Sequence, residues 1–134
     1  LVTIGNIEMP EIPEEHRESQ ILSAVALTTK IRSLSNDCVV IQNNGLERLC
    51  DHTAGMIDGI CWENPPFNRP ESFKWAEKML YKIKSLKEKY QIQLFLLFED
   101  NEDEAAKKIA RENNYLIYSA PAGYTKGVNS LACP

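Results

Sequence analysis

Apolar residues gather in five short runs along the chain, and amphipathic segments separate the runs. The runs cover residues 2–7, 38–42, 56–62, 92–98 and 115–119. The second run reads CVVIQ and is rich in β-branched residues, whereas the fourth contains LFLLF and is apolar without alternation. Short continuous runs of this kind predict β-strands that are covered on both faces.

Helical periodicity fills the segments between the runs, and it predicts helices over residues 14–34, 46–52, 70–90 and 102–113. In the first helix the predicted buried stripe is Ile21, Leu22, Val25 and Ala26. In the third it is Phe73, Ala76, Met79, Leu80, Ile83, Leu86 and Tyr90. Pro70 suits a first helical turn, because its missing N–H has no partner there.

Strands that alternate with helices predict an α/β fold of parallel βα repeats. The sheet either stays open and doubly wound or forms part of a TIM (β/α)8 barrel. No GxGxxG or GxxxxGK[ST] motif follows a run, which disfavours the nucleotide-binding open sheets. A whole barrel needs about 200–250 residues, and this chain of 134 begins inside its first run. We therefore expect residues 1–134 to form one partial barrel domain, strands 4–8, from a longer chain.

Composition and charge limit the classes of partner that the chain is expected to bind. The chain is 43% hydrophobic and 25% charged, as globular domains are, and its net charge of −4 disfavours nucleic acid as a partner. No stretch approaches the roughly 20 apolar residues of a membrane span, so no membrane partner is expected. No leader is visible in the first thirty residues, and the sequence alone leaves the compartment open.

The cysteines and histidines predict no metal site and no cofactor, because their spacing lacks any metal-ligand signature. They are Cys38, Cys50, Cys61, Cys133, His16 and His52. Two interpretations of the cysteines stay open: buried free thiols that act as small hydrophobes, or one or two disulfides.

The candidate functional residues are those that directly follow the apolar runs, because parallel sheets bind ligands at the carboxyl ends of their strands. Carboxylates, amides and aromatic rings are frequent there and suit hydroxyl-bearing ligands such as sugars. Glu8 and Glu63 follow two different runs and are candidates for the two carboxyls of glycoside hydrolysis. Helix capping or a solvated loop is the alternative for both. Candidate substrate-binding residues are Asn6, Gln42, Asn43, Trp62 and Tyr124.

Three stretches carry a resemblance to a known family. They read CVVIQNNGLERL, MIDGICWENPPFN and IQLFLLFEDNEDEAAKKIARENNYLIYSAPAGY. Together they resemble the C-terminal half of the endo-α-1,4-polygalactosaminidases, glycoside hydrolase family 114. That family has a strand ending in PQNG, an IDG strand leading to a Glu, and a last strand like FIPYVAP. Here these correspond to residues 41–45, residues 57–59 with Glu63, and residues 115–121, and the likeness covers about residues 36–124.

The resemblance implies a secreted TIM-barrel enzyme that cleaves α-1,4-linked galactosamine polymers with two carboxylates. Glu63 matches the Glu after the sixth barrel strand, which would be the general acid. The other family acid lies after the fourth strand in a D-N-x-D pattern, where this chain has Gly5-Asn6-Ile7-Glu8. Gly5 replaces the first acid and only Glu8 matches the second. Two hypotheses follow: a hydrolase that uses Glu8, or a non-catalytic carbohydrate-binding relative.

A third hypothesis is a metabolic barrel enzyme with a phosphate site formed by Gly123, Lys126 and Gly127. The expected partner in the first two cases is an oligosaccharide or polysaccharide, in particular an amino-sugar polymer. Half a barrel also leaves strand edges unpaired. The chain is therefore expected to need its missing N-terminal half or to self-associate.

Overall fold

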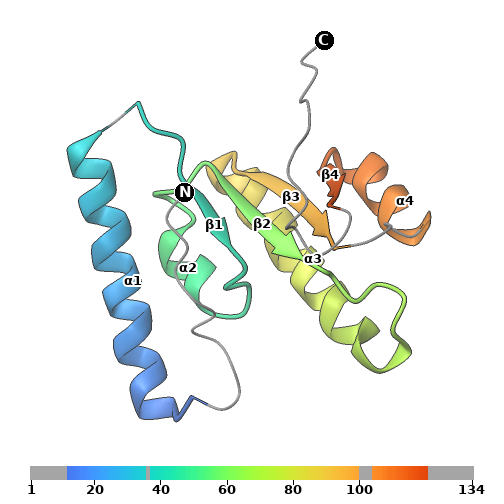
Figure 1. Cartoon of the computed structure of the whole chain (residues 1–134), viewed down its shortest axis with the longest axis horizontal. Helices are drawn as coiled ribbons and strands as arrows, with labels where there is room; N and C mark the ends of the chain where they lie inside the picture. The colour runs from blue at the N-terminus through green and yellow to red at the C-terminus, as the bar shows by residue number, and fades with distance from the viewer. Residues whose placement is uncertain (1–11, 36, 100–103, 121–134) are drawn as a thin grey trace.

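A computed structural model describes residues 12–35, 37–99 and 104–120. Helices and strands alternate there in the order α1 Glu14–Leu34, β1 Ile41–Asn43, α2 Leu49–Thr53, β2 Gly59–Glu63, α3 Pro70–Tyr90, β3 Gln93–Phe98, α4 Glu104–Asn113 and β4 Leu116–Ser119 (Figure 1). The predicted βα alternation is confirmed, and a strand overlaps each of four of the five apolar runs. The run at residues 2–7 lies outside the described residues.

The four strands form one parallel sheet in which their order along the chain is also their order in space. The register pairs Gln42 with Ile60, Ile60 with Leu94, and Leu96 with Ile117. Crossovers between parallel strands are right-handed in nearly all proteins. A strand order without reversal therefore places the connecting helices on the same face of the sheet.

The packing of the core agrees with that expectation. One face of the sheet contributes the buried side chains of Ile60, Trp62, Leu94, Leu96 and Phe98. The helices α2, α3 and α4 contribute Cys50, Ala76, Met79, Ile83, Ala106 and Ala110 to the same cluster. A doubly wound sheet would carry helices on both faces. The described strands instead have the one-sided helix layer that parallel barrels also have.

We call the opposite side of the sheet the inner face. It carries Ile41, Asn43, Cys61, Glu63, Phe95, Leu97, Leu116 and Tyr118. None of these is fully buried among the described residues, and Leu116 and Tyr118 are 54% and 50% exposed. Burial along β3 therefore alternates although its sequence does not. The prediction that the strands are covered on both faces thus holds for the face that carries the helices. It does not hold for the inner face.

Helix α1 packs against α2, with the bounds that the sequence predicts but with a shifted buried stripe. Ile21, Ala24 and Thr28 are buried, whereas Leu22 and Ala26 of the predicted stripe are exposed. Both stripes have helical spacing, so periodicity alone does not separate them. The Thr28 hydroxyl donates to the carbonyl of Ala24 at 2.8 Å, which satisfies this buried polar group inside the helix.

Helix α3 also has its predicted bounds, but Phe73 and Tyr90 at its two ends are exposed instead of buried. A helix of 21 residues is about 30 Å long, whereas strands of five or six residues span about 17–20 Å. The end turns therefore extend past the sheet, and the middle residues Ala76, Met79 and Ile83 fill the core. No helix in the described part of the chain is long and apolar enough to cross a membrane.

Candidate functional site

A polar cleft of about 660 Å³ lies at the carboxyl ends of β1 and β2, where parallel α/β sheets hold their ligands. The loops after the two strands and the first turns of α3 form its walls. Its polar lining consists of Arg17, Asn44, Glu47, Glu63, Asn64, Arg69, Glu71 and Ser72. Two aromatic side chains, Trp62 and Trp75, also line the cleft.

Glu63 is the last residue of β2 and lies half-buried in this cleft. Its carboxylate accepts a hydrogen bond of 3.2 Å from the side-chain amide of Asn44. The backbone N–H of Glu63 donates in turn to the side-chain oxygen of Asn44 at 3.1 Å. One asparagine therefore fixes both the main chain and the carboxylate of Glu63. A carboxylate can accept up to about four hydrogen bonds, so capacity for a ligand remains.

Asn44 and Asn64 hold the strand ends in the same way. Both adopt the left-handed conformation, with φ of 54° and 44°, which asparagine tolerates better than most residues. Their backbone N–H groups donate to the carbonyls of Cys61 and Leu97 on the neighbouring strands, each at 2.7 Å. The Asn64 side-chain oxygen also accepts the N–H of Glu99 at 2.9 Å. These two amides thus extend the sheet and position the loops of the cleft.

The predicted ligand residues Gln42 and Asn43 have different surroundings. Gln42 lies on the helix side, where its amide donates to the carbonyl of Asn44 at 2.8 Å and its oxygen accepts from the hydroxyl of Thr53. These contacts tie Gln42 to the turn that supports the cleft. Asn43 lies on the inner face, as Glu63 does, and its side-chain oxygen is buried without a hydrogen-bond partner among the described residues.

The accessible ring of the cleft belongs to Trp75. Trp62, the predicted stacking residue, is 2% exposed and packs edge-on against Phe67 and Trp75, with ring centroids 5.3 Å and 5.8 Å away. Trp75 is 36% exposed, and its indole N–H donates to the carboxylate of Glu47. Sequence reasoning missed Trp75 because it falls outside the buried stripe of its helix. Its place early in the helix that follows β2 was the available signal.

The Cys61 thiol near the site is inert in character. Cys61 lies on the inner face two residues before Glu63, and burial raises its pKa to about 11, with a further contribution from the Glu63 charge. A protonated thiol is a poor nucleophile, so Cys61 is no candidate for covalent catalysis. The three described cysteines, Cys38, Cys50 and Cys61, are free. The described residues contain no group of three or more His, Cys, Asp and Glu side chains placed to hold a metal ion.

The remaining predicted site residues lie outside the part of the chain that the structure describes. They are Asn6, Glu8, Tyr124 and the phosphate candidates Gly123, Lys126 and Gly127, besides Cys133. Their roles stay predictions. Within the described residues, Glu63 and Trp62 meet in one cleft, and Gln42 supports the loop beside it.

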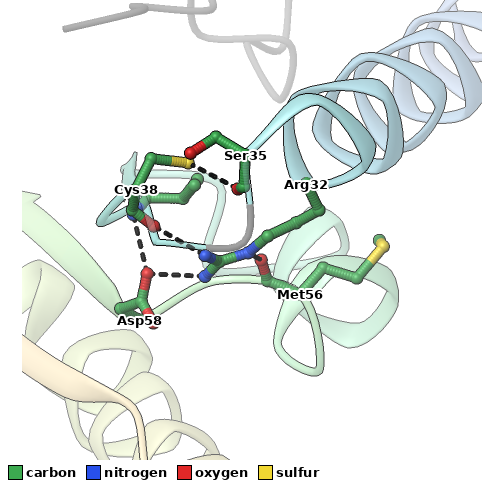
Figure 2. Close-up of polar contacts among 6 residues, drawn as sticks. Arg32, Ser35, Cys38, Met56 and Asp58 are labelled. Carbon is green, nitrogen blue, oxygen red and sulfur yellow. Dashed lines mark hydrogen bonds and ion pairs between the residues drawn. The ribbon is translucent and has the colours of Figure 1, made fainter.

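At the opposite end of the sheet, Arg32 of α1 binds three groups through its guanidinium (Figure 2). It donates to the carbonyls of Met56 at 2.6 Å and Cys38 at 2.7 Å, and to the Asp58 carboxylate at 2.5 Å. The same carboxylate oxygen accepts the N–H of Val40 at 2.7 Å. The Val40 N–H and the Arg32 guanidinium hold the pKa of Asp58 below its ordinary value, although partial burial opposes them. This cluster fixes α1 to the sheet.

Comparisons of the chain with protein-family models, with curated proteins and with solved structures found no match. The chemistry of the cleft is therefore the guide to function. Its chemistry is that of a half-buried carboxylate with an amide partner, further acids and an accessible indole ring.

Proposed function

We propose that this chain belongs to a carbohydrate-active protein of the (β/α) barrel type and that its cleft binds an oligosaccharide or polysaccharide. In this proposal Glu63 is the general acid of glycosidic-bond hydrolysis. The observation that supports it most is the position of Glu63, a half-buried carboxylate held by Asn44 at the carboxyl end of a parallel strand. The resemblance to polygalactosaminidases points to the same residue.

The lining of the cleft suits a sugar. Amide and carboxylate groups pair with hydroxyls, and the exposed face of the Trp75 ring can pack on the C–H face of a pyranose. A volume of about 660 Å³ lies within the roughly 300–1,000 Å³ of small-ligand sites. Three acids and two arginines line it: Glu47, Glu63, Glu71, Arg17 and Arg69. The excess of acids favours an amino sugar, because its ammonium group is cationic.

Hydrolysis of a glycosidic bond requires two carboxyl groups. In the proposed reaction the Glu63 carboxyl group donates a proton to the glycosidic oxygen as the bond from that oxygen to the anomeric carbon breaks. A second carboxylate either attacks the anomeric carbon or removes a proton from the water that attacks it. Glu8 is the acid that the resemblance assigns to this second role. Where the second carboxylate has attacked, water that gives its proton to Glu63 then displaces that carboxylate from the anomeric carbon. In both routes the water hydroxyl ends on the anomeric carbon and the water proton on one of the two carboxylates.

A non-catalytic carbohydrate-binding protein is the second candidate. Gly5 stands where the family has its first acid, and the observation favours loss of hydrolysis with the binding cleft retained. In that case galactosamine oligomers bind, but no reducing ends are released.

The test compares three proteins on α-1,4-linked galactosamine polymer: the wild type, Glu63→Gln and Glu99→Gln. Glu99 is an exposed acid at the same end of the sheet that does not line the cleft, so it serves as the matched control. We expect Glu63→Gln to release reducing ends at least about 100-fold more slowly, the usual contribution of a general acid. Glu99→Gln should match the wild type.

Undiminished turnover in Glu63→Gln would contradict the catalytic role. Binding of the polymer by the wild type without any release of reducing ends would support the binding protein instead. Absence of both binding and release would overturn the carbohydrate proposal.

A further inference from the structure

A chain of hydrogen bonds runs from the buried end of α2 to the Glu63 carboxylate. Thr53 donates its hydroxyl to the side-chain oxygen of Gln42, and the Gln42 amide donates to the carbonyl of Asn44. The side-chain amide of Asn44 then donates to Glu63. We propose that Gln42 and Thr53 are positioning residues, which set the place of the Glu63 carboxylate through Asn44. This inference rests on the proposed function, in which Glu63 is the general acid.

The turn between Gln42 and Glu63 has a backbone conformation that needs support. Asn44 and Gly45 have φ of 54° and 70°, so two successive residues lie in the left-handed region. A residue with a side chain adopts this conformation less readily than glycine does. Asn44 bonds to Glu63 through both the nitrogen and the oxygen of its side chain, so a change in the turn would break this pair of bonds. Contacts that hold the turn therefore also hold the carboxylate.

Gln42 holds this turn through the nitrogen of its side-chain amide. The nitrogen donates to the carbonyl of Asn44 at 2.8 Å and to that of Gly45 at 3.3 Å. A Cβ atom on Gly45 would lie 2.9 Å from the same nitrogen, so the lack of a side chain at position 45 lets the amide approach. Because the nitrogen bonds to the turn, the oxygen of Gln42 faces Thr53, which is 1% exposed and donates its hydroxyl. The orientation of the amide is thus fixed from both sides.

The position of Gln42 favours support of the acid over contact with a sugar. Gln42 lies on the helix side of the sheet, in register with the core residue Ile60, and it is not among the described residues that line the cleft. Glu63 lies on the opposite, inner face. Misplacement of a catalytic group by about 1 Å can slow a reaction about 100-fold. Loss of the Gln42 amide should therefore lower kcat and leave substrate binding unchanged.

The test measures kcat and KM on α-1,4-linked galactosamine polymer for the wild type, Gln42→Met and Gln93→Met. Methionine keeps the length of glutamine and makes none of its amide hydrogen bonds. We expect Gln42→Met to lower kcat about tenfold, with KM within about twofold of the wild type. Gln93 is the matched control, because its half-buried amide also donates to two carbonyls, those of Leu94 and Asn114, at the amino end of the sheet. Gln93→Met should keep the wild-type kcat.

Two further comparisons separate positioning from a general loss of structure. Gln42→Met in the Glu63→Gln background should cause no further loss of the residual rate, because the carboxylate that it positions is already absent. Thr53→Val removes the hydroxyl that Gln42 accepts and should also lower kcat, whereas Thr53→Ser keeps the hydroxyl and should keep the wild-type kcat. An equal loss of rate from Gln42→Met in both backgrounds would assign Gln42 to the stability of the fold and overturn the inference.

A measurement without substrate distinguishes failure of this inference from failure of the proposed function. NMR follows the side-chain N–H resonances of Asn44, which Asn44→Gly identifies by their loss, as the pH is lowered until Glu63 is protonated. We expect these resonances to shift in the wild type and to stay in place in Glu63→Gln and in Gln42→Met.

A wild type that shows this shift but releases no reducing ends would overturn the hydrolase and leave the positioning of the carboxylate by Gln42 standing. Turnover by the wild type with an unchanged kcat in Gln42→Met would overturn the positioning role and leave the hydrolase standing. A raised KM alone would overturn it too, because Gln42 would then contact the substrate. An equal shift of the Asn44 resonances in Gln42→Met would likewise contradict the inference.

Discussion

Two carboxylates at opposite ends of β2 have opposite environments. Asp58 precedes the strand, and one of its oxygens binds both the Arg32 guanidinium at 2.5 Å and the Val40 N–H at 2.7 Å. Glu63 ends the strand, lines a cleft of about 660 Å³, and takes one hydrogen bond of 3.2 Å from the amide of Asn44. The first carboxylate is matched by a cation, and the second has an uncharged partner.

The comparison teaches how to assign roles to acids in a parallel sheet. Residue type does not distinguish Asp58 from Glu63, and both lie near a strand end. Their partners distinguish them, since a carboxylate that is already paired with an arginine connects parts of the fold. Amino ends of parallel strands commonly stabilise, and carboxyl ends commonly bind and react.

Arg32→Met should cost about 2–3 kcal/mol of unfolding free energy, because charged hydrogen bonds to two carbonyls and to Asp58 are lost. The methionine keeps the apolar stem of the arginine, so packing is largely preserved. Urea unfolding measures the change. Lys30→Met, at an exposed position of the same helix, should stay within about 0.5 kcal/mol of the wild type. Equal losses in the two variants would mean that the cluster contributes nothing specific.

Asn44→Ala should cost about 2 kcal/mol, because it removes the side-chain bonds to Glu63 and forces alanine into a left-handed conformation. Asn44→Gly separates the two causes, since glycine accepts φ of 54° without strain. We expect the glycine variant to lose about half as much in the same urea experiment. An alanine variant as stable as the wild type would remove the role of Asn44 as the support of Glu63.

The smallest expected effect is the contribution of Asp58 to the pH dependence of the unfolding free energy. Its folded pKa is lowered from 3.8, so its contribution to stability is present above that value and is lost as pH falls through the lower folded pKa. Solvent screens the half-exposed carboxylate, which keeps the effect small. The measurement is the stability difference between wild type and Asp58→Asn at neutral pH and at successively lower pH below 3.8. A difference that stays constant would show that Asp58 is not stabilised by its charge.

Local patterns predicted the elements of this fold well. The helices 14–34 and 70–90 match α1 and α3, because long periodic segments determine their own boundaries and Pro70 starts the second. The strands follow from apolar runs between turn residues. The pattern did not predict which stripe of α1 is buried. That choice depends on the surface of α2, which a short stretch of the α1 sequence does not include.

The position of the candidate site was predictable only in part. Its position at the strand ends and the residue Glu63 follow from the sequence, since both depend on strand order alone. The pairing of Arg32 with Asp58 joins residues 26 apart, and the side-chain bond from Asn44 to Glu63 joins residues 19 apart. Such pairs depend on how elements pack. The sequence therefore does not tell that Trp62 is buried or that Trp75 supplies the exposed ring.

The most direct test of the division between the two carboxylates is thermal unfolding of Glu63→Gln and Asp58→Asn, each with and without galactosamine oligomers. Glutamine at position 63 can still accept the Asn44 bond, so we expect the wild-type Tm but no rise in Tm with the oligomer. Asp58→Asn should lower the Tm and keep the ligand-induced rise. A lowered Tm in Glu63→Gln together with a retained rise would contradict the account, because Glu63 would then stabilise the fold and not the bound sugar.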